Sequence, residues 1–185
     1  MNAATAMFAT ALLLLCGGAQ AADQPYAGQE GREIASLSAE DVAALLDGQG
    51  WGLAKPAELN GYPGPAHVLE LSDALELSEA QAARVKEIFD RMKNEARALG
   101  AEYVEAEEHL SRMFRMGHAN AGMLDAQLSA SAEALAQLRA VHLKAHLATT
   151  PVLSEAQLTA YAKLRGYDGA AHGGHGHGHG GHAHD

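Results

Sequence analysis

The sequence is poor in cysteine and in aromatic residues. Its 185 residues include a single cysteine, Cys16, and only 5% are Phe, Trp or Tyr. One cysteine cannot form an internal disulfide, so stability must come from packing. With so few aromatic residues, the core must be built from Leu, Ala, Val and Met, which pack between closely spaced helices. The composition therefore favours an all-α fold.

Positive charge is also scarce. Lys and Arg number 13 against 23 Asp and Glu, which gives a formal net charge of −10. Because phosphate binding depends on clustered Lys and Arg, nucleic acid is not expected as a partner, and divalent metal ions are the more natural ligands. The one basic run, from Arg84 to Arg97, alternates with acidic residues at helical spacing, which is typical of a solvated face of ion pairs.

No apolar run is long enough to span a bilayer, but residues 1–22 have the features of a signal peptide. Residues 9–15 are apolar and are followed by the small-residue site Ala19-Gln20-Ala21, although no Lys or Arg precedes them. The mature chain is then exported and begins near Ala22, without cysteine. In the alternative, Cys16 is the acylated residue of a lipoprotein, but Leu15 stands where a small residue is expected.

Residues 23–64 are predicted to form a flexible leader with one short helix. Ser38-Ala-Glu-Asp41 has the pattern of a helix N-cap, and the helix should stop at Gly48. Gly48 to Gly64 is rich in Gly and Pro and reads as a loop. Pro65 is suited to the first position of the next helix, which carries His67.

The pentapeptide Leu-Ser-Glu-Ala-Gln occurs twice, at residues 77–81 and 153–157. In each copy the serine, Ser78 or Ser154, can accept a hydrogen bond from the third helical N–H group. The glutamine that ends each copy can reach back to the serine's own N–H group, which completes a capping box. Each copy therefore predicts the start of a helix.

Two long helices are predicted between these boxes. The apolar spacing alternates between three and four residues from Val85 to Met113 and again from Leu124 to Ala145, with a glycine-containing break between. Gly100 costs about 1 kcal/mol relative to Ala, which a long helix can absorb. We predict one domain at residues 65–168, a long antiparallel helical hairpin with shorter flanking helices, and a last helix after Ser154. A turn near residue 118 would place His142 roughly opposite Glu95.

The C-terminal residues 169–185 contain only Gly, Ala, His and Asp, so we predict a disordered tail. Histidines on a flexible backbone can converge on one Zn, Ni or Cu ion, or they can serve in a solubilising tail that binds metal only as an affinity tag does. The candidate ligands in the tail are His172, His175, His177, His179, His182 and His184.

Two further groups of residues have metal-binding chemistry. His142 and His146 are four residues apart, so they share one helix face and can bind a metal together, with His67 as a third ligand. The alternative is that His142 is a hydrogen-bonded core residue and His146 a partly exposed neighbour. Thioethers and an imidazole near the predicted turn, at Met113, Met116, His118 and Met123, suit copper, although methionine packing is the simpler interpretation.

No pattern in the sequence predicts an enzyme. The mature chain has no cysteine nucleophile, no glycine-rich phosphate loop, no nucleophile elbow and no His-Glu-x-x-His motif. We therefore expect binding rather than catalysis.

The two capping boxes on either side of a long helical pair, behind a signal peptide, resemble the Spy/CpxP family, which carries a Leu-Thr-x-x-Gln motif twice. The resemblance covers residues 65–167, with serine in place of threonine in both motifs. It implies a periplasmic, largely α-helical cradle, often a homodimer, that acts as an ATP-independent refolding chaperone or as a heavy-metal sensor. In the metal-sensing branch, ligands lie on the first helix and late in the second hairpin helix, positions that resemble those of His67, His142 and His146.

The match to the metal-sensing branch is partial, because Ser72 and Phe89 stand near positions where that branch has further ligands. The His-rich tail is similar to that of zinc resistance-associated proteins. The sequence thus predicts a periplasmic heavy-metal-binding sensor or chaperone. Zinc is the preferred metal, with Ni or Cu as alternatives. The expected partners are a sensor-kinase periplasmic domain or unfolded periplasmic proteins. The alternative is a metal-independent, ATP-independent holdase.

Overall fold

The computed structural model describes residues 24–167, so the predicted signal peptide and the tail with its six histidines lie outside the described residues. The described residues fall into two units, residues 24–31 and residues 32–167. In the first unit, residues 24–31 form turns, one of them closed by a hydrogen bond from the Ala27 N–H to the Gln24 carbonyl (3.0 Å). The helices all belong to the second unit.

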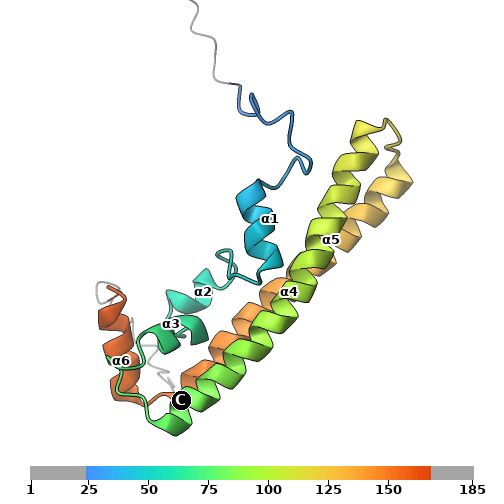
Figure 1. Cartoon of the computed structure of the whole chain (residues 1–185). Coiled ribbons are helices and arrows are strands. Elements are labelled where there is room, and N and C mark those ends of the chain that lie inside the picture. Colours follow the sequence, from blue (N-terminus) through green and yellow to red (C-terminus); the bar gives the residue numbers. More distant parts are fainter. Residues whose placement is uncertain (1–23, 168–185) are drawn as a thin grey trace, which may run out of the picture. The chain divides into compact units, whose positions relative to one another are not determined.

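Residues 32–167 contain helices and no strand, which confirms the predicted all-α class (Figure 1). No helix in the described part of the chain combines the length and apolar character needed to cross a membrane. In chain order the elements are α1 (Ala39–Leu46), α2 (Lys55–Glu58), α3 (Pro65–Glu70), α4 (Glu79–Arg115), α5 (Ala121–Thr149), the 3-10 turn η1 (Thr150–Val152) and α6 (Glu155–Leu164).

The three predicted N-caps are confirmed. Ser38, Ser78 and Ser154 each accept a hydrogen bond from the third residue of the following helix, whose side chain accepts one from the serine N–H. At the start of each of α1, α4 and α6, two backbone N–H groups that have no partner within the helix thereby gain a hydrogen bond. Both copies of the repeated pentapeptide begin helices, and α3 begins at Pro65 as expected.

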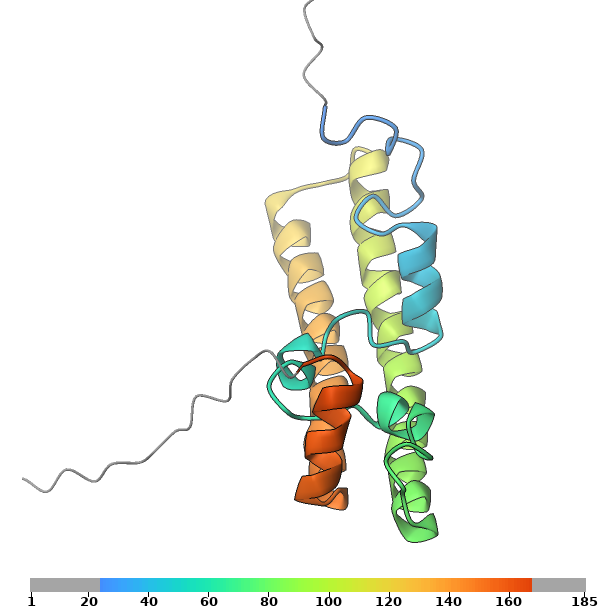
Figure 2. The same ribbon diagram turned by 90° about the vertical axis from the view of Figure 1, so that its left-hand side faces the viewer.

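Helices α4 and α5 run side by side in opposite directions in both views (Figures 1 and 2). The chain reverses direction through residues 116–120, between the end of α4 and the start of α5. Gly117 adopts a left-handed conformation there (φ +68°), which glycine tolerates without steric cost. The Asn120 side chain then caps α5 by accepting from the Met123 N–H at 3.1 Å.

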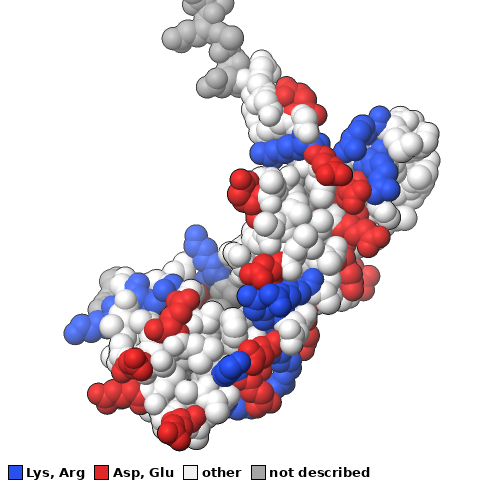
Figure 3. All heavy atoms as spheres, viewed as in Figure 1, with Lys and Arg blue, Asp and Glu red and all other residues white. Residues whose placement is uncertain are grey.

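The exposed face of α4 carries the predicted ion pairs. Acidic and basic atoms are interspersed along the visible face of the long helices (Figure 3). Lys86 pairs with Asp90 at 2.6 Å, and Glu87 pairs with both Arg84 (2.5 Å) and Arg91 (2.9 Å). Each such exposed pair contributes only a few tenths of a kcal/mol, as for other pairs three or four residues apart on a helix.

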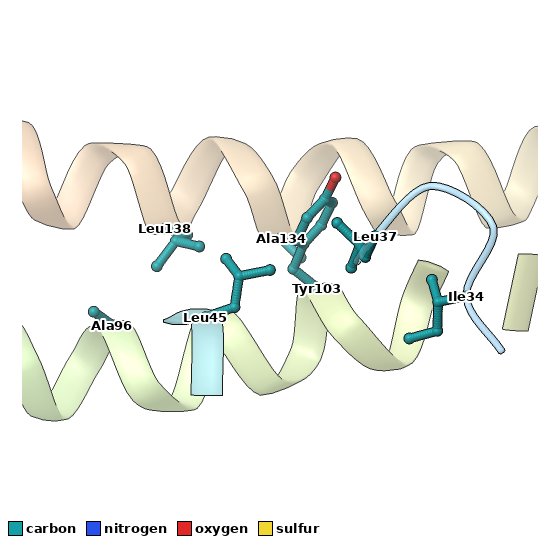
Figure 4. Close-up of a cluster of buried hydrophobic side chains, with 7 residues drawn as sticks. All are labelled: Ile34, Leu37, Leu45, Ala96, Tyr103, Ala134 and Leu138. Atoms are coloured by element: carbon teal, nitrogen blue, oxygen red, sulfur yellow. The ribbon is translucent and has the colours of Figure 1, made fainter. Parts of the chain in front are cut away.

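A first hydrophobic core joins α4 and α5 to the segment that precedes α2 (Figure 4). Ile34, Leu37 and Leu45 are at most 7% exposed and pack with residues of both long helices. The sequence predicts a flexible leader with one short helix at residues 23–64, because the apolar residues there are too few and too widely spaced to show a period. A second short helix, α2, lies in the stretch that is predicted to be a loop. The core consists of Ile34, Leu37, Leu45, Ala96, Tyr103, Ala134 and Leu138.

A second core lies at the end of the long helices opposite the 116–120 turn, where α3 and α6 are found (Figures 1 and 2). It consists of Val68, Leu75, Val85, Leu153 and Tyr161.

The two repeated pentapeptides meet at this end. The side-chain amide of Gln81 donates to the Gln157 carbonyl oxygen at 2.8 Å, and Gln157 donates back at 3.2 Å. The same amide groups also donate to the backbone carbonyls of Val152 (2.9 Å) and Leu75 (3.1 Å). A carboxylate in place of either glutamine would have no N–H to donate, which explains why both copies end in Gln.

Candidate functional site

Glu58, at the end of α2, is a buried carboxylate surrounded by polar groups from α3, α5 and α6. Only 8% of the residue is exposed. A buried charge is tolerated when it is paired and hydrogen-bonded, and Glu58 has several partners for its two oxygens. The partners are the Tyr161 hydroxyl (2.5 Å), the Gly64 N–H (3.1 Å), His67 Nδ1 (3.2 Å), the Tyr167 hydroxyl (3.2 Å), Arg165 Nε (3.4 Å) and His146 Nδ1 (3.7 Å).

A turn after α2 folds the chain back over Glu58. Gly61 has a positive φ of +84°, and the chain then passes Pro63 to Gly64, whose N–H points at the Glu58 carboxylate. A Cβ atom on Gly64 would lie 2.9 Å from Cε1 and 3.0 Å from Nε2 of His146. Glycine at this position therefore lets the imidazole of α5 approach the carboxylate of α2.

Several groups act together on the ionisation of Glu58. Burial raises the pKa of its carboxyl, but the Tyr161 hydrogen bond, the His67 charge and the Gly64 N–H lower it by more, so the pKa lies below its usual value. Burial and the same hydrogen bond raise the pKa of Tyr161 far above its ordinary range. The pair is thus an ionised carboxylate with a neutral phenol as its donor.

His67 and His146 face Glu58 from different helices. His67, on α3, has a side chain 37% exposed, and its Nε2 lies 3.4 Å from an Arg165 nitrogen. His146, on α5, donates from Nδ1 to the Tyr62 carbonyl at 2.7 Å. This hydrogen bond fixes the His146 tautomer and leaves Nε2 with its lone pair available.

His142 lies one turn before His146 and is 2% exposed. Its Nε2 is buried and has no hydrogen-bond partner within residues 24–167. Burial, with a smaller contribution from His146, lowers the pKa of His142, which favours the neutral imidazole. A buried nitrogen without a partner costs free energy, so it requires an explanation.

The three predicted histidines and Glu58 line one cavity of about 590 Å³, with Phe89 among its apolar lining residues. We call Glu58, His67, His142 and His146 the Glu58 cluster. Within residues 24–167, however, no three His, Cys, Asp or Glu side chains are already arranged so as to hold a metal ion. The structure thus brings the predicted residues to the same cavity without forming a complete coordination sphere.

The prediction that His142 lies roughly opposite Glu95 concerns two residues that line different pockets. Glu95 lines a pocket together with Val141 and Lys144. His142 instead shares its cavity with Phe89 and Met92, one to two turns earlier on α4.

Sequence reasoning missed Glu58, Tyr161, Arg165 and Tyr167. Glu58 is a lone acidic residue in a Gly- and Pro-rich stretch, where no periodicity marks a buried face. The only available signal was that Pro56 can begin a short helix, whose end would then carry Glu58. The α6 residues gave no signal because charged and aromatic side chains at the end of a short helix are normally solvated.

Comparisons of the chain with protein-family models, with curated proteins and with solved structures find no match. Function must therefore be inferred from the chemistry of the Glu58 cluster.

Proposed function

We propose that the protein is an exported, periplasmic heavy-metal-binding protein of Spy/CpxP type. It binds a transition metal through the Glu58 cluster, with zinc as the preferred ion and nickel or copper as the alternatives. The observation that supports this function is the convergence of a buried carboxylate and three histidines on one cavity. These residues come from α2, α3 and α5 and span residues 58–146.

The donor set fits a borderline transition metal. Histidine nitrogens with one carboxylate oxygen form a common zinc donor set, and the same ligands suit nickel and copper. The hydrogen bond from His146 Nδ1 to the Tyr62 carbonyl is the kind of outer contact that orients a metal-binding imidazole. The buried Nε2 of His142 has no hydrogen-bond partner within residues 24–167, so no protein contact in that part of the chain competes with a metal for this nitrogen.

Binding at these residues would compete with contacts to α6. Glu58 now accepts hydrogen bonds from Tyr161 and Tyr167 and lies beside Arg165. A carboxylate oxygen that turns toward a metal gives up some of these partners, so α6 and the chain that follows Tyr167 would change position. This coupling is how we propose that metal binding is converted into a conformational signal, with a sensor-kinase periplasmic domain as the class of partner that reads it.

The tail histidines, from His172 to His184, are proposed to bind the same metals and to raise their concentration near the cluster. They follow Tyr167 by a few residues in the sequence. Because short Gly-rich links give effective concentrations in the mM range, such a tail can supply metal to a nearby site.

The test is calorimetric titration of Zn and Ni into mature protein whose six tail histidines are replaced by Ser. We expect one binding site of submicromolar affinity, because several protein ligands act together. His142→Ala and Glu58→Gln should each weaken binding by about tenfold or more, since even outer-shell changes cost that much.

Glu102→Gln is the matched control for Glu58→Gln, because Glu102 lies on α4 outside the Glu58 cluster and is exposed. It should leave the Zn and Ni affinities unchanged. Circular dichroism of each variant checks that the helices are retained. If the protein without tail histidines takes up no metal although its helices are intact, the Glu58 cluster is not a metal site.

A second candidate function, a metal-independent holdase, is favoured by apolar side chains exposed on the long helices. Phe114, Leu128 and Leu147 are 58%, 47% and 57% exposed. Such side chains can shield unfolded clients. A holdase would suppress the aggregation of a denatured client equally with and without a chelator, whereas the metal-dependent function predicts that suppression changes when metal is removed.

A further inference from the structure

A second hollow, of about 250 Å³, lies where α4 turns into α5, at the opposite end of the long helices from α3 and α6. Three of the protein's six methionines line it, together with two histidines. We call His109, Met113, Met116, His118 and Met123 the tip site. Among the described residues, no carboxylate lines this hollow, and its other lining residues are Arg112 and Gln127.

The spacing of these residues places their side chains on the same face of each helix. His109, Met113 and Met116 follow one another at intervals of four and three residues along the last turns of α4. Met123 lies in the first turn of α5, and His118 belongs to the connecting turn. Sulfur and imidazole groups from three consecutive elements therefore reach the same hollow.

The backbone that carries these ligands is fixed by hydrogen bonds. The His118 N–H donates to the Met113 carbonyl at 3.0 Å, and Gly117 between α4 and His118 has a φ of +68°. On the other side, the Asn120 side chain accepts from the Met123 N–H at 3.1 Å. These contacts are a helix C-cap and a helix N-cap, so the turn holds its shape without any ligand.

The methionines differ in burial in a way that packing does not explain. Met113 is 8% exposed, whereas Met116 and Met123 are 58% and 50% exposed. Two exposed thioethers thus flank a buried third. Exposed apolar side chains contribute nothing to the core, and their gathering around one hollow is what a ligand site requires.

We propose that the tip site binds Cu(I), through the thioether sulfurs of its methionines and at least one of its imidazoles. Thioethers are soft ligands that select Cu(I), and imidazole also suits copper. All five side chains can bind as neutral donors, which matches a monovalent ion better than a divalent one. The Arg112 charge beside the hollow is neutralised by its ion pair with Glu108.

The tip site differs in chemistry from the Glu58 cluster and does not depend on it. The cluster offers a carboxylate and imidazoles, which suit zinc and nickel, while the tip site offers sulfur. His109 Nε2 lies 4.0 Å from a Glu105 oxygen, too far for a hydrogen bond, so this nitrogen remains available to a metal.

The decisive experiment uses Ag(I), a redox-inert substitute for Cu(I), on the full mature protein labelled with 13C at its methionine methyl groups. The methyl resonances of Met113, Met116 and Met123 should shift on addition of Ag(I). The resonance of Met92, which lies in the cavity of the Glu58 cluster, is the internal control and should not move. Zn should leave all three tip resonances in place.

Competition with a chromogenic Cu(I) chelator under anaerobic, reducing conditions measures the affinity. In protein whose six tail histidines are replaced by Ser, Met116→Leu combined with Met123→Leu should weaken Cu(I) binding by at least about tenfold, since even outer-shell contacts of a metal site cost that much. Met92→Leu is the matched control. These changes conserve volume, and the two tip residues are exposed, so the fold is retained.

In the NMR experiment, any Ag(I) taken up by the tail histidines would not shift the methyl resonances of the tip methionines. If Ag(I) leaves the three tip resonances unmoved, the tip site is not a soft-metal site and the copper is bound by imidazoles alone. If the double variant binds Cu(I) as tightly as the Met92→Leu control, the proposal is also overturned.

Discussion

The hydrogen bond from Tyr161 to Glu58 joins α6 to α2, and Tyr161 is only 3% exposed. Tyr161→Phe keeps the ring but leaves a buried carboxylate oxygen without one of its donors. Bonds to charged groups contribute about 1.5–3 kcal/mol, so we expect the free energy of unfolding to fall by about that amount. Urea denaturation of the two proteins measures the difference.

Tyr62→Phe is the control for this change. The Tyr62 side chain is exposed, and only its backbone carbonyl is used, by His146. Removing its hydroxyl should change stability by no more than about 0.5 kcal/mol. Equal losses of stability in the two variants would show that the buried Tyr161 hydroxyl contributes no more to stability than the exposed Tyr62 hydroxyl does.

Asp41 provides a prediction of pH dependence away from the histidines. The Trp51 Nε1–H donates to it at 2.8 Å and the Ser38 N–H at 2.9 Å, and these bonds lower the pKa of its carboxyl. A lowered folded-state pKa contributes stability above the unfolded-state pKa, and that stability is lost as the pH falls through the folded-state value. Asp41→Asn should therefore cost about 1 kcal/mol, typical of one hydrogen bond, at pH 7.

The stability gap between Asp41→Asn and the parent protein should begin to close as the pH falls below about 4, the ordinary pKa of the unfolded state, and should be lost as the carboxyl of the folded parent, whose pKa is lower, becomes neutral. Thermal unfolding at several pH values measures it. Asp125→Asn removes the same charge from an exposed position on α5 and should show no such gap. A gap that stays constant down to pH 2 would contradict the role assigned to the carboxylate.

At this scale, the sequence predicted the histidines but not what surrounds them. Helical spacing alone placed His142 and His146 on one face, and both line the cavity of the Glu58 cluster. The carboxylate of Glu58 became visible only in three dimensions. Its partners Tyr161 and Gly64 are 103 and 6 residues away, and sequence periodicity carries no information about contacts between different elements.

At the scale of helices, Gly100 determines how closely α1 approaches α4. A Cβ atom there would lie 2.9 Å from the Leu45 carbonyl carbon and closer still to its oxygen. Gly100→Ala gains about 1 kcal/mol of helix propensity but forces a backbone contact apart, and overpacking costs about 1–3 kcal/mol. Since a backbone carbonyl cannot move aside as a flexible side chain does, we expect a net loss of stability.

Gly122→Ala is the matched control, since Gly122 is also in a helix but the nearest atom to an added Cβ is Asn120 Oδ1, at 3.8 Å. It should gain stability. Denaturant titration of both variants gives opposite signs if the α1 contact is decisive. The sequence predicted only the propensity cost of Gly100, because the apolar spacing of α4 does not reveal which further element covers that position.

The Gln81–Gln157 pair makes a prediction about the two repeated boxes together. Each glutamine caps its own helix and also bonds to the other. Gln81→Ala and Gln157→Ala should each destabilise the protein, and the double variant should cost less than the sum by about 0.5 kcal/mol or more, because the shared bond is lost only once. Strict additivity, measured by a double-mutant cycle in urea, would mean that the two boxes act independently.

The elements themselves were largely predictable from the sequence, because caps, proline and apolar spacing are local signals. The helices beginning after Ser38, Ser78 and Ser154 and at Pro65 were all expected. Burial followed the expected spacing less closely on α4, where Ile88, Gly100 and Glu107 are also buried. Residues 32–64 cover a second face of this helix, a tertiary contact that no pattern within α4 can specify.

At the scale of the whole molecule, the Glu58 cluster and the tail should have different effects on stability. A ligand stabilises a fold only to the extent that it binds the folded state more tightly than the unfolded state. The histidines of the cluster come together only when α2, α3 and α5 are folded. A tail that is disordered in both states would bind metal equally in both and would leave the unfolding equilibrium unchanged.

Thermal unfolding of the full mature chain with Zn therefore reports on the Glu58 cluster even though the tail is present. At a free Zn concentration one hundred times the Kd, stabilisation is about 2.7 kcal/mol, which for a domain of this size raises Tm by about 5–10 °C. Replacing the six tail histidines by Ser should preserve that rise, while Glu58→Gln should reduce it. A rise in Tm that disappears with the tail histidines and survives Glu58→Gln would assign the metal function to the tail, because a fold cannot be stabilised by a site in which it takes no part.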